Sequence, residues 1–344
     1  MNTRADAAAV PGGTVADLGE RDLIARIQER LPPASRALLV GIGDDAAVLE
    51  PPRGRLEVLT TDGLVEGIHF DRRFSTPFDI GWKALAVNLS DIAAMGAAPA
   101  AALLSLALPE SMGIDALDGL IDGFLSLAGE SRVGLAGGNV TRSPGPLVVD
   151  VTVTGSVRRR DVLRRNGARP GDGVFVTGSI GAARAGLEFL MAGGSEISLD
   201  GMDACIERYC RPAPRYRIGA LLGRVRAATA CMDLSDGLAD AARQVAEASG
   251  VGIRLTADAL PVSEACRRWF DERGGDAIAA AAAGGDDYEL LFTVPRKRTG
   301  RLRHVVQQAR NVPITRIGEI TAEKGAELIR NGSREPLPAG FVHF

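Results

Sequence analysis

Segments with apolar residues at helical spacing alternate along the chain with short, continuous apolar runs. Between residues 17 and 31 apolar side chains return every three or four positions until Pro32-Pro33, which predicts a helix. The same spacing predicts helices at residues 77–95, 114–128, 182–191, 237–248 and 301–310. Residues 277–283 are rich in alanine, and a plain helix explains them.

Short apolar runs between these helices predict strands. They are residues 56–61, 101–108, 133–136, 147–157, 174–177, 228–232, 252–255, 288–294 and 314–317. Because helices and strands alternate in both halves, the fold class is α/β (α+β), with two mixed α/β domains. The strand at residues 56–61 is expected to deliver Asp62 at its end, and residues 137–139 are expected to follow the short strand before them.

A domain boundary is predicted in residues 158–172. This stretch is basic and then contains the turn sequence RPGDG at residues 169–173. A chain of 344 residues suggests about two domains. We therefore expect a disordered extension over residues 1–16, an N-terminal domain over residues 17–157 and a C-terminal domain over residues 158–344.

Composition excludes several classes of partner. The chain is 46% hydrophobic but only 4% aromatic, so its core must consist mainly of Ala, Val, Leu and Ile. A net charge of -3 provides no general attraction for nucleic acid. The longest apolar stretch, residues 97–108, falls short of the ~20 residues that a membrane span needs. No nucleic-acid partner and no membrane are expected.

The few cysteines and histidines argue against a zinc centre. The four cysteines form no Cys-x-x-Cys pair, and the chain has only three histidines. Reduced structural thiols fit the cytoplasm. Residues 1–13 contain no apolar segment of the kind found in signal peptides.

Five short acidic segments occur where an apolar run stops or starts. They are GDD at residues 43–45, TTD at 60–62, NLSD at 88–91, DLSDG at 233–237 and GGDD at 284–287. Carboxylates beside Gly, Ser and Thr suit hard cations such as Mg²⁺ held against phosphates. The chain has no G-x-x-x-x-G-K-[ST] loop, so a nucleotide would have to be held through metal ions.

Each acidic segment also has a plainer explanation. The plainer explanation for residues 41–47 is an ordinary surface turn, since Gly and Asp are common turn residues. The apolar residues 38–40 and 48–49 argue against it, because they would place the two acids between buried segments. The TTD segment then reflects β-propensity and capping. Asp236 can be the N-cap of the next helix, but a cap leaves Asp233 unexplained, so we favour function for that loop.

Other candidate residues leave similar alternatives open. Asp91 lies in a helix lined with Ala, Leu and Ile. It either binds a ligand or lies on the solvated face of that helix. His69 is a lone histidine, which is more often a packed residue than a catalytic one. Gly137-Gly138 permits close backbone approach to a ligand but also fits a turn. The arginines at residues 158–160 and 164–165 belong either to a solvated loop or to a phosphate contact.

Taken in order, the motifs closely resemble those of the thiamine-monophosphate kinase family. The matching segments are GIGDDAA at 41–47, TDGLVEGIHF at 61–70, KALAVNLSDIAAMG at 83–96, RNGARPGD at 165–172, DLSDG at 233–237, GGDDYEL at 284–290 and GFVHF at 340–344. This family belongs to the superfamily of aminoimidazole ribonucleotide synthetase, selenophosphate synthetase and a hydrogenase maturation factor. Residues 62–70 and the terminal His343-Phe344 resemble the kinase more than its relatives.

The resemblance implies a reaction, a fold and an assembly. The implied reaction transfers the γ-phosphate of ATP, the co-substrate, directly to thiamine monophosphate, with several Mg²⁺ ions, giving thiamine diphosphate and ADP. The implied assembly is a homodimer whose N-terminal domains pair into an intersubunit β-barrel. The acceptor phosphate is already ionised near neutral pH, since its second pKa is about 6, so no strong general base is needed.

The resemblance also implies roles for individual residues. The implied Mg²⁺ ligands are Asp45, Thr60, Thr61, Asp62, Asp91, Asn139, Asp233 and Asp236. Gly138, Arg165 and Ser235 would meet ATP, and His69, Asp286 and Phe341 would meet the substrate. Among these, the catalytic set is Asp62, Asp91, Asp233 and Arg165, which align the reactants and neutralise charge.

Three positions depart from the family pattern. Asn139 stands where the family has Asp, so one carbonyl oxygen remains but the charge is lost. Asp286 replaces a Glu, which shortens its reach toward the substrate, and Ile121 replaces a frequent tyrosine. Two other functions therefore remain open. One is another ATP-dependent enzyme of the superfamily, of the aminoimidazole ribonucleotide synthetase type, and the other is a non-catalytic ATP-binding sensor.

Overall fold

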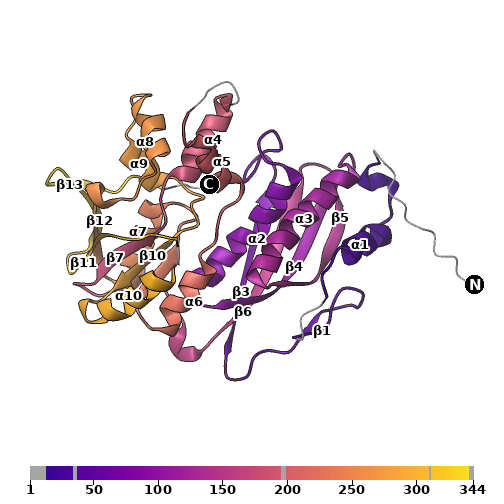
Figure 1. Ribbon diagram of the computed structural model, residues 1–344, viewed down its shortest axis with the longest axis horizontal. Coiled ribbons are helices and arrows are strands. Elements are labelled where there is room, and N and C mark those ends of the chain that lie inside the picture. Colours follow the sequence, from indigo (N-terminus) through magenta and orange to yellow (C-terminus); the bar gives the residue numbers. More distant parts are fainter. Residues whose placement is uncertain (1–12, 34–36, 195–198, 310, 341–344) are drawn as a thin grey trace, which may run out of the picture. The chain divides into compact units, whose positions relative to one another are not determined.

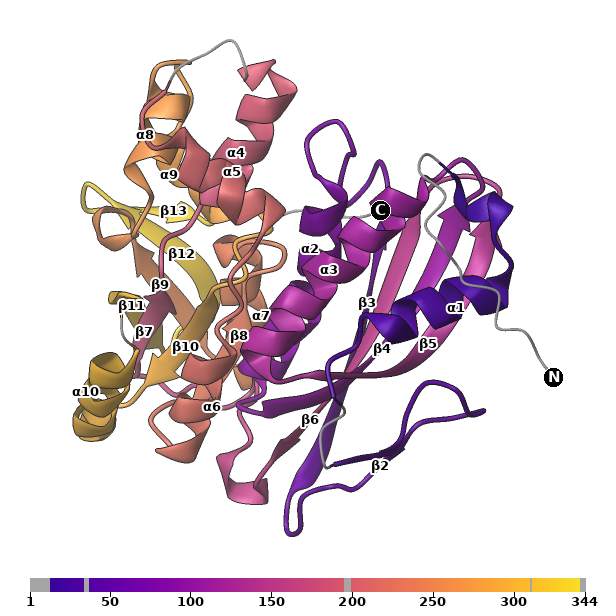
Figure 2. The same ribbon diagram turned by 45° about the vertical axis from the view of Figure 1, so that its right-hand side comes forward.

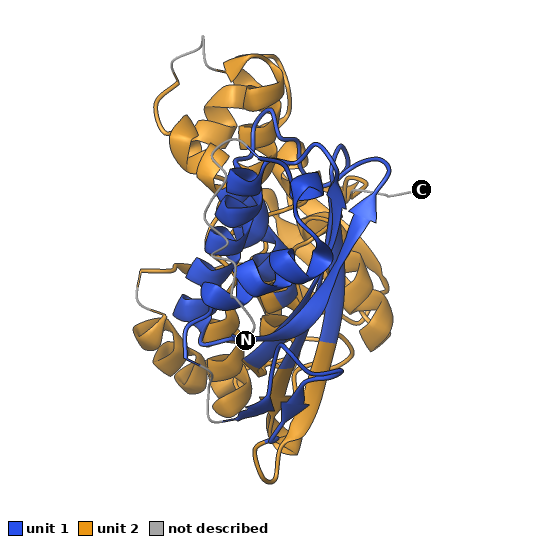
Figure 3. Ribbon diagram, turned by 90° about the vertical axis from the view of Figure 1, so that its right-hand side faces the viewer, with its two compact units in different colours: residues 1–51, 60–88, 100–154 blue, residues 52–59, 89–99, 155–344 orange. Residues whose placement is uncertain are grey.

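The computed structural model describes residues 13–33, 37–194, 199–309 and 311–340. The chain divides into two compact units, and each combines segments that are distant in the sequence (Figure 3). Unit 1 contains Met1–Pro51, Thr60–Asn88 and Ala100–Thr154, and unit 2 contains Pro52–Leu59, Leu89–Pro99 and Gly155–Phe344. The chain passes between the units at five places rather than at one linker, and four of these passages lie inside a helix or a strand.

A four-stranded sheet with two long helices on one face dominates the first half of the chain (Figures 1 and 2). Its order is β3-β6-β4-β5, with β3 (Leu56–Val65), β6 (Val148–Val157), β4 (Ala98–Pro109) and β5 (Gly134–Ser143). The helices are α2 (Pro77–Ala94) and α3 (Ile114–Ser131). Glycines let them touch, because a Cβ at Gly81 would overlap the carbonyl oxygen of Leu120 and one at Gly123 would overlap that of Phe78.

The N-terminal part of unit 1 is attached to α3. It comprises η1 (Val15–Asp17), α1 (Glu20–Glu29) and a two-stranded sheet of β1 (Leu38–Val40) and β2 (Val48–Leu49). Arg26 on α1 donates to Asp118 at 2.7 Å. Residues 13–16, predicted to belong to a disordered extension, form a turn in which the N–H of Val15 donates to the carbonyl of Met112 at 2.8 Å.

Unit 2 is built on a seven-stranded sheet of order β13-β12-β9-β11-β7-β10-β8. The strands are β7 (Gly173–Thr177), β8 (Ala230–Asp233), β9 (Gly252–Thr256), β10 (Leu290–Val294), β11 (Ile314–Thr321), β12 (Gly325–Arg330) and β13 (Ser333–Pro336). Its longer helices are α4 (Ala182–Met191), α5 (Met202–Cys210), α6 (Tyr216–Arg224), α7 (Leu238–Ser249), α8 (Glu264–Asp271), α9 (Ala277–Ala283) and α10 (Thr299–Gln308). Short 3-10 turns are η2 (Arg159–Asp161), η4 (Ala257–Ala259) and η5 (Arg296–Arg298). Neighbouring strands run antiparallel except β12 and β9.

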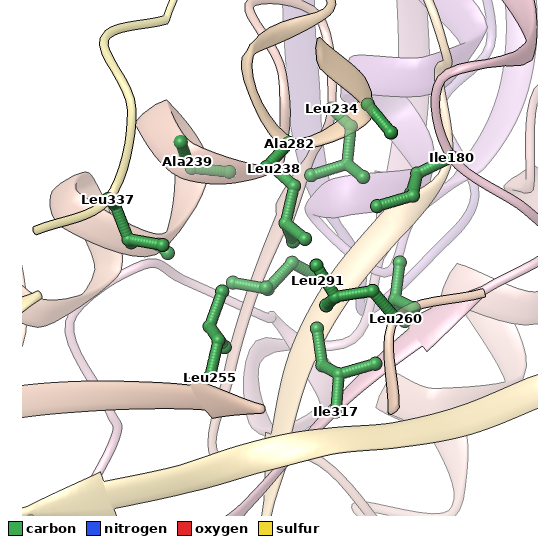
Figure 4. Close-up of a cluster of buried hydrophobic side chains, with 14 of the residues drawn as sticks. Ile180, Leu234, Leu238, Ala239, Leu255, Leu260, Ala282, Leu291, Ile317 and Leu337 are labelled. Carbon is green, nitrogen blue, oxygen red and sulfur yellow. The ribbon is translucent and has the colours of Figure 1, made fainter. Parts of the chain in front are cut away.

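Successive side chains of β10 pack into two different hydrophobic cores, one on each face of this sheet. Leu291 packs into the core that contains Leu234, Leu238 and Ile317 (Figure 4). Its neighbours in sequence, Leu290 and Phe292, belong to a second core formed with α6 and α10. Strand periodicity explains the split, since adjacent side chains on a strand point to opposite faces. The sheet is therefore buried on both sides, which holds the ends of β8 and β10 in place.

Most predicted helices and strands are present, and three local expectations were wrong. β3 continues to Val65, so Asp62 lies inside the strand instead of at its end. β5 continues to Ser143, so residues 137–139 lie within it. The apolar residues of β1 and β2 are not buried, since Leu39 and Val48 are 61% and 46% exposed. Among the described residues, no helix combines the length and the apolar character needed to cross a bilayer.

Candidate functional site

The acidic loop after β8 holds a buried carboxylate. Asp233 is the last residue of β8 and is only 3% exposed. The hydroxyl of Ser90, near the end of α2, donates a hydrogen bond to Asp233 Oδ2 at 2.8 Å. Asp91 is the next residue on α2, so two carboxylates from elements far apart in sequence come close together.

The electrostatics of this pair are unfavourable without a cation. Burial raises the pKa of Asp233 to about 7, and the charge of Asp91 raises it as well. The hydrogen bond from Ser90 and the charge of Arg165 lower the pKa only in part. Because a buried carboxylate interacts with the charge of a second, half-buried carboxylate, the donor set fits a divalent cation such as Mg²⁺.

A second acidic loop, residues 284–288, runs beside the first. The N–H of Asp286 donates to the carbonyl of Ser235 at 2.8 Å, and the N–H of Tyr288 donates to that of Leu234 at 2.9 Å. Asp286 and Tyr288 both have left-handed backbones, with φ of 66° and 47°. Non-glycine residues adopt this conformation at an energetic cost, and such residues concentrate at functional sites. The Tyr288 hydroxyl also donates to Asp286 Oδ1 at 3.1 Å.

A buried ion-pair network anchors that second loop. Glu289 is fully buried and forms ion pairs with Arg208 of α5 and with Arg215 at the start of α6. The hydroxyl of Thr177 donates to Glu289 Oε2 at 2.6 Å. Asp287 accepts a hydrogen bond from the N–H of Gly181 at 2.8 Å, and burial raises its pKa to about 8. The backbone of residues 284–288 is thus fixed by charges that lie beneath it.

Arg165 and Gly340, the last described residue, border the loop after β8. The exposed Arg165 donates to Gln244 of α7 at 2.6 Å, and Gln244 donates to Asp240 at 2.6 Å. A Cβ at Gly340 would lie 2.9 Å from the carbonyl oxygen of Asp236, so the chain passes this loop just before it ends. Phe341, which the resemblance assigns to the substrate, lies outside the described residues.

Unit 1 contains a cavity of about 720 Å³ between the loop at residues 41–47 and the sheet. Three predicted site residues line it together, namely Asp45, Gly138 and Asn139. Asp44 and Asp150 line it as well. Gly138 also has a structural reason to be glycine. A Cβ at this position would overlap the carbonyl oxygen of Leu104 on the parallel neighbour β4.

The TTD segment on β3 presents its side chains to both faces of the sheet. The hydroxyl of Thr61 receives a hydrogen bond from Thr152 at 3.1 Å and lies 3.4 Å from Asp150 Oδ1. Thr60 and Asp62 point to the other face, because side chains alternate along a strand. His69 serves the turn after β3, where its Nδ1 accepts a hydrogen bond from the N–H of Val65 at 3.1 Å.

The predicted residues therefore do not all come together, and each unit contains some of them. In unit 2, Asp91 of α2 and Asp233 of β8 lie near each other, and the loops of Ser235 and Asp286 are hydrogen-bonded to each other. In unit 1, Asp45 and Asn139 line the cavity, whereas Thr60, Thr61 and Asp62 lie on β3 and do not line it. Within the described ranges, no three His, Cys, Asp or Glu side chains are grouped closely enough to hold a metal ion by themselves. Hydroxyl, amide and phosphate oxygens would have to complete any Mg²⁺ coordination.

Two residues at these sites received no role from the sequence. Ser90 lies inside the NLSD motif, but its partner Asp233 is 143 positions away and no local pattern connects them. Asp150 had a usable signal, because alternation along residues 147–157 places Asp150, Thr152 and Thr154 on one polar face of the strand.

Comparisons with known proteins show the family to which the chain is similar. The family models of AIR synthase related proteins match the chain, the N-terminal domain model at residues 43–157 and the C-terminal domain model at residues 169–331. The thiamine-monophosphate kinase of Salmonella typhimurium is 40% identical over 330 residues, covering 95% of this chain and 98% of that protein.

Solved structures give the same result. The crystal structure of thiamine-monophosphate kinase from Stenotrophomonas maltophilia superposes with a TM-score of 0.78 at 38% identity, covering 92% of this chain and 96% of the other. The structure of AaThiL complexed with AMPPCP and TMP has a TM-score of 0.75 at 34% identity and covers 95% of this chain and 98% of that one.

Proposed function

The chain belongs to the thiamine-monophosphate kinase family, and from that premise we propose how its residues carry out the reaction. It transfers the γ-phosphate of ATP to thiamine monophosphate and releases thiamine diphosphate and ADP. The observation that carries the proposal is the buried Asp233 with the half-buried Asp91 close to it, beside the loop of Ser235 and Asp286. This pair supplies concentrated negative charge that a phosphate-bound cation would neutralise.

We assign Mg²⁺ binding to hard oxygen donors of both units. In unit 2 these are Asp91, Asp233 and Asp236, and in unit 1 they are Asp45, Thr60, Thr61, Asp62 and Asn139. When bound, Mg²⁺ neutralises the charge on the phosphate groups of the two reactants. Ser90 keeps one oxygen of Asp233 in a fixed direction, which orients the other oxygen for binding.

The remaining residues bind and orient the two phosphates. Arg165, held by Gln244, is positioned to stabilise charge on the phosphoryl group that moves. Gly138 and Ser235 offer backbone and hydroxyl groups to ATP. No general base is assigned, because the acceptor oxygen of a phosphomonoester with a second pKa of about 6 is already ionised near neutral pH.

Substrate recognition is assigned to His69, Asp286 and Phe341. Thiamine monophosphate carries a cationic thiazolium ring, which a carboxylate favours. The Tyr288 hydroxyl fixes the direction of the Asp286 carboxylate, and the hydrogen bond to Ser235 fixes its backbone. Asp286 is shorter than the Glu of the family pattern, so this placement matters more here.

A homodimer and a cytoplasmic location complete the proposal. Leu59 of β3 and Leu103 of β4 are 65% and 42% exposed, which supports burial of this sheet in an intersubunit β-barrel. Cys205, Cys210, Cys231 and Cys266 are free and buried, as expected for a reducing compartment.

The test is an assay of the purified protein with ATP, Mg²⁺ and thiamine monophosphate. Thiamine diphosphate is expected to form in step with ADP, and Asp91→Asn is expected to lower kcat by at least about 100-fold. Asp122→Asn, on the exposed side of α3, is the matched control. ADP with free phosphate and no thiamine diphosphate would indicate a ligase-type relative, and ATP binding without turnover would indicate a sensor.

A further inference from the structure

A second cavity, of about 410 Å³, lies within unit 2 and contains none of the candidate site residues. Four arginines line it, which are Arg55 before β3, Arg158 before η2, and Arg217 and Arg224 on α6. Cavities of roughly 300–1,000 Å³ are the size of small-molecule sites. Its concentration of guanidinium groups sets it apart from an ordinary surface depression.

Three of the four arginines that line this cavity have no ion-pair partner among the described residues. Arg55, Arg158 and Arg224 form no ion pair with any side chain in the described part of the molecule. Asp161 is the one acid among the lining residues, so four positive charges face one negative charge. The side chain of Ser156 adds a hydroxyl to the wall. By formal charge, the lining side chains thus carry an excess of three positive charges, four from arginines and one offset by Asp161.

The buried Asp161 carboxylate lacks full hydrogen bonding within the protein. Its Oδ1 atom is buried and accepts no hydrogen bond from the described residues, and the Nε of Arg160 is 3.7 Å away. Buried polar atoms without a partner are rare and call for an explanation.

The wall that carries Arg217 and Arg224 is held by close backbone packing. A Cβ at Gly219 would overlap the carbonyl oxygen of Ala93, and one at Gly223 would overlap that of Asp161. These two glycines are four positions apart on α6 and therefore lie on the same face of the helix. The helix is fixed against the end of α2 and against η2, so the cavity is preformed.

We propose that this cavity binds the diphosphate group of a small organic molecule. A diphosphate ester carries about three negative charges near neutral pH, which matches the net charge of the cavity. Arginine is the residue best suited to bind phosphate oxygens in a bidentate manner. Ala220 and Leu221 leave an apolar side for the organic part of the ligand. A nucleoside diphosphate and the diphosphate product of the proposed reaction share this chemistry.

Isothermal titration of the full-length protein with inorganic diphosphate in EDTA tests the proposal. Chelation removes the divalent metal on which nucleotide binding at the proposed catalytic site depends, so the result is independent of the proposed function. We expect saturable binding that Arg158→Ala combined with Arg224→Ala weakens at least ten-fold. Arg159→Ala is the matched control, because Arg159 is exposed on the same 3-10 turn but does not line the cavity.

Further arms of the experiment identify the ligand class. ADP and thiamine diphosphate are titrated in the same way into the wild type, the double variant and Arg165→Ala. Binding that the double variant loses and Arg165→Ala retains assigns the ligand to this cavity. The absence of saturable diphosphate binding, equal affinity in the double variant, or equally tight binding of sulfate would each overturn the proposal.

Discussion

Ser90 donates a hydrogen bond of 2.8 Å to the buried carboxylate of Asp233, although the two residues are 143 positions apart. The bond joins the end of α2 to the end of β8. It also gives the carboxylate a partner in a place where water has little access, which limits the rise in its pKa. Because Asp233 is the acid on which the proposed metal site depends, this bond links the fold of unit 2 to its chemistry.

Replacing Ser90 by Ala is expected to reduce both stability and activity. A buried oxygen of Asp233 would lose its donor, which costs about 1–3 kcal/mol in the free energy of unfolding. The carboxylate would also rotate more freely, so kcat/KM should fall at least ten-fold. Urea unfolding and steady-state kinetics measure the two effects.

Ser131→Ala is the matched control for Ser90→Ala. Ser131 is also a buried helical serine, but its hydroxyl donates to the carbonyl of Leu127 in its own helix at 2.7 Å. Activity should stay within about two-fold of wild type. Equal losses of activity in the two variants would contradict the role of Ser90 as a positioning residue.

Glu289→Gln is expected to be strongly destabilising. The substitution leaves Arg208 and Arg215 without their shared carboxylate, and breaking a buried ion pair typically costs about 3–5 kcal/mol. Because Glu289 directly follows the loop of Asp286, KM for thiamine monophosphate should rise more than KM for ATP. Chemical denaturation and kinetics with each substrate varied provide the measurement.

Glu110→Gln provides the comparison for Glu289→Gln. Glu110 pairs with Arg142 at 2.8 Å, and both side chains are largely exposed. Such surface pairs contribute about 0–1 kcal/mol. A loss at Glu289 no larger than the loss at Glu110 would show that the buried network does not hold the loop.

Asp287→Asn is expected to change how stability depends on pH. Burial raises the pKa of Asp287 from 3.8 to about 8, so between these values the folded state binds a proton that the unfolded state has released. The free energy of unfolding therefore falls as pH rises through this window, by up to about 1.4 kcal/mol per unit from this group. The variant lacks the titration, and its Oδ1 can still accept from Gly181.

Urea unfolding of the wild type and of Asp287→Asn at pH 5, 6, 7 and 8 tests this. The variant should gain stability relative to the wild type with every step upward in pH. Asp271→Asn, at the exposed end of α8, is the surface control measured in the same way. A constant difference for Asp287→Asn would mean that this carboxyl group is ionised throughout the range.

Gly138→Ala is expected to destabilise the protein by about 1–3 kcal/mol, because the new Cβ would overlap the carbonyl oxygen of Leu104 and push β5 away from β4. Gly134→Ala, on the same strand, meets no atom within 4 Å and should be neutral or slightly stabilising. Thermal unfolding of the two variants distinguishes a packing requirement from a general intolerance of side chains on β5.

Local sequence patterns were sufficient to predict the bounds of elements that depend mainly on interactions between residues close in the sequence. The bounds of α4 and α9 are those predicted, since apolar spacing and alanine content act within one or two helical turns. The same patterns did not predict the bounds of a strand whose length depends on pairing with a strand distant in the sequence. Thr61 and Asp62 continue β3 because β6 offers them cross-strand partners such as Thr152, and no local signal reveals those partners.

The candidate site follows the same division. Asp233 and Asp286 could be found because acids directly after apolar strands are visible in the sequence. Glu289 could not be assigned, because its partners Arg208 and Arg215 lie in helices that were not predicted. Metal ligation by Asp45, Asp62 and Asn139 remains a prediction, since it rests on the resemblance alone.

The division of the chain into units has a consequence for its evolution and engineering. The polypeptide passes from one unit to the other five times, and the passages fall within α2, β3, β4 and β6 as well as at Pro51 and Pro52. No single cut by a protease can release either unit intact. A chimera with a relative would likewise need several crossover points, so the two units are expected to have been inherited together.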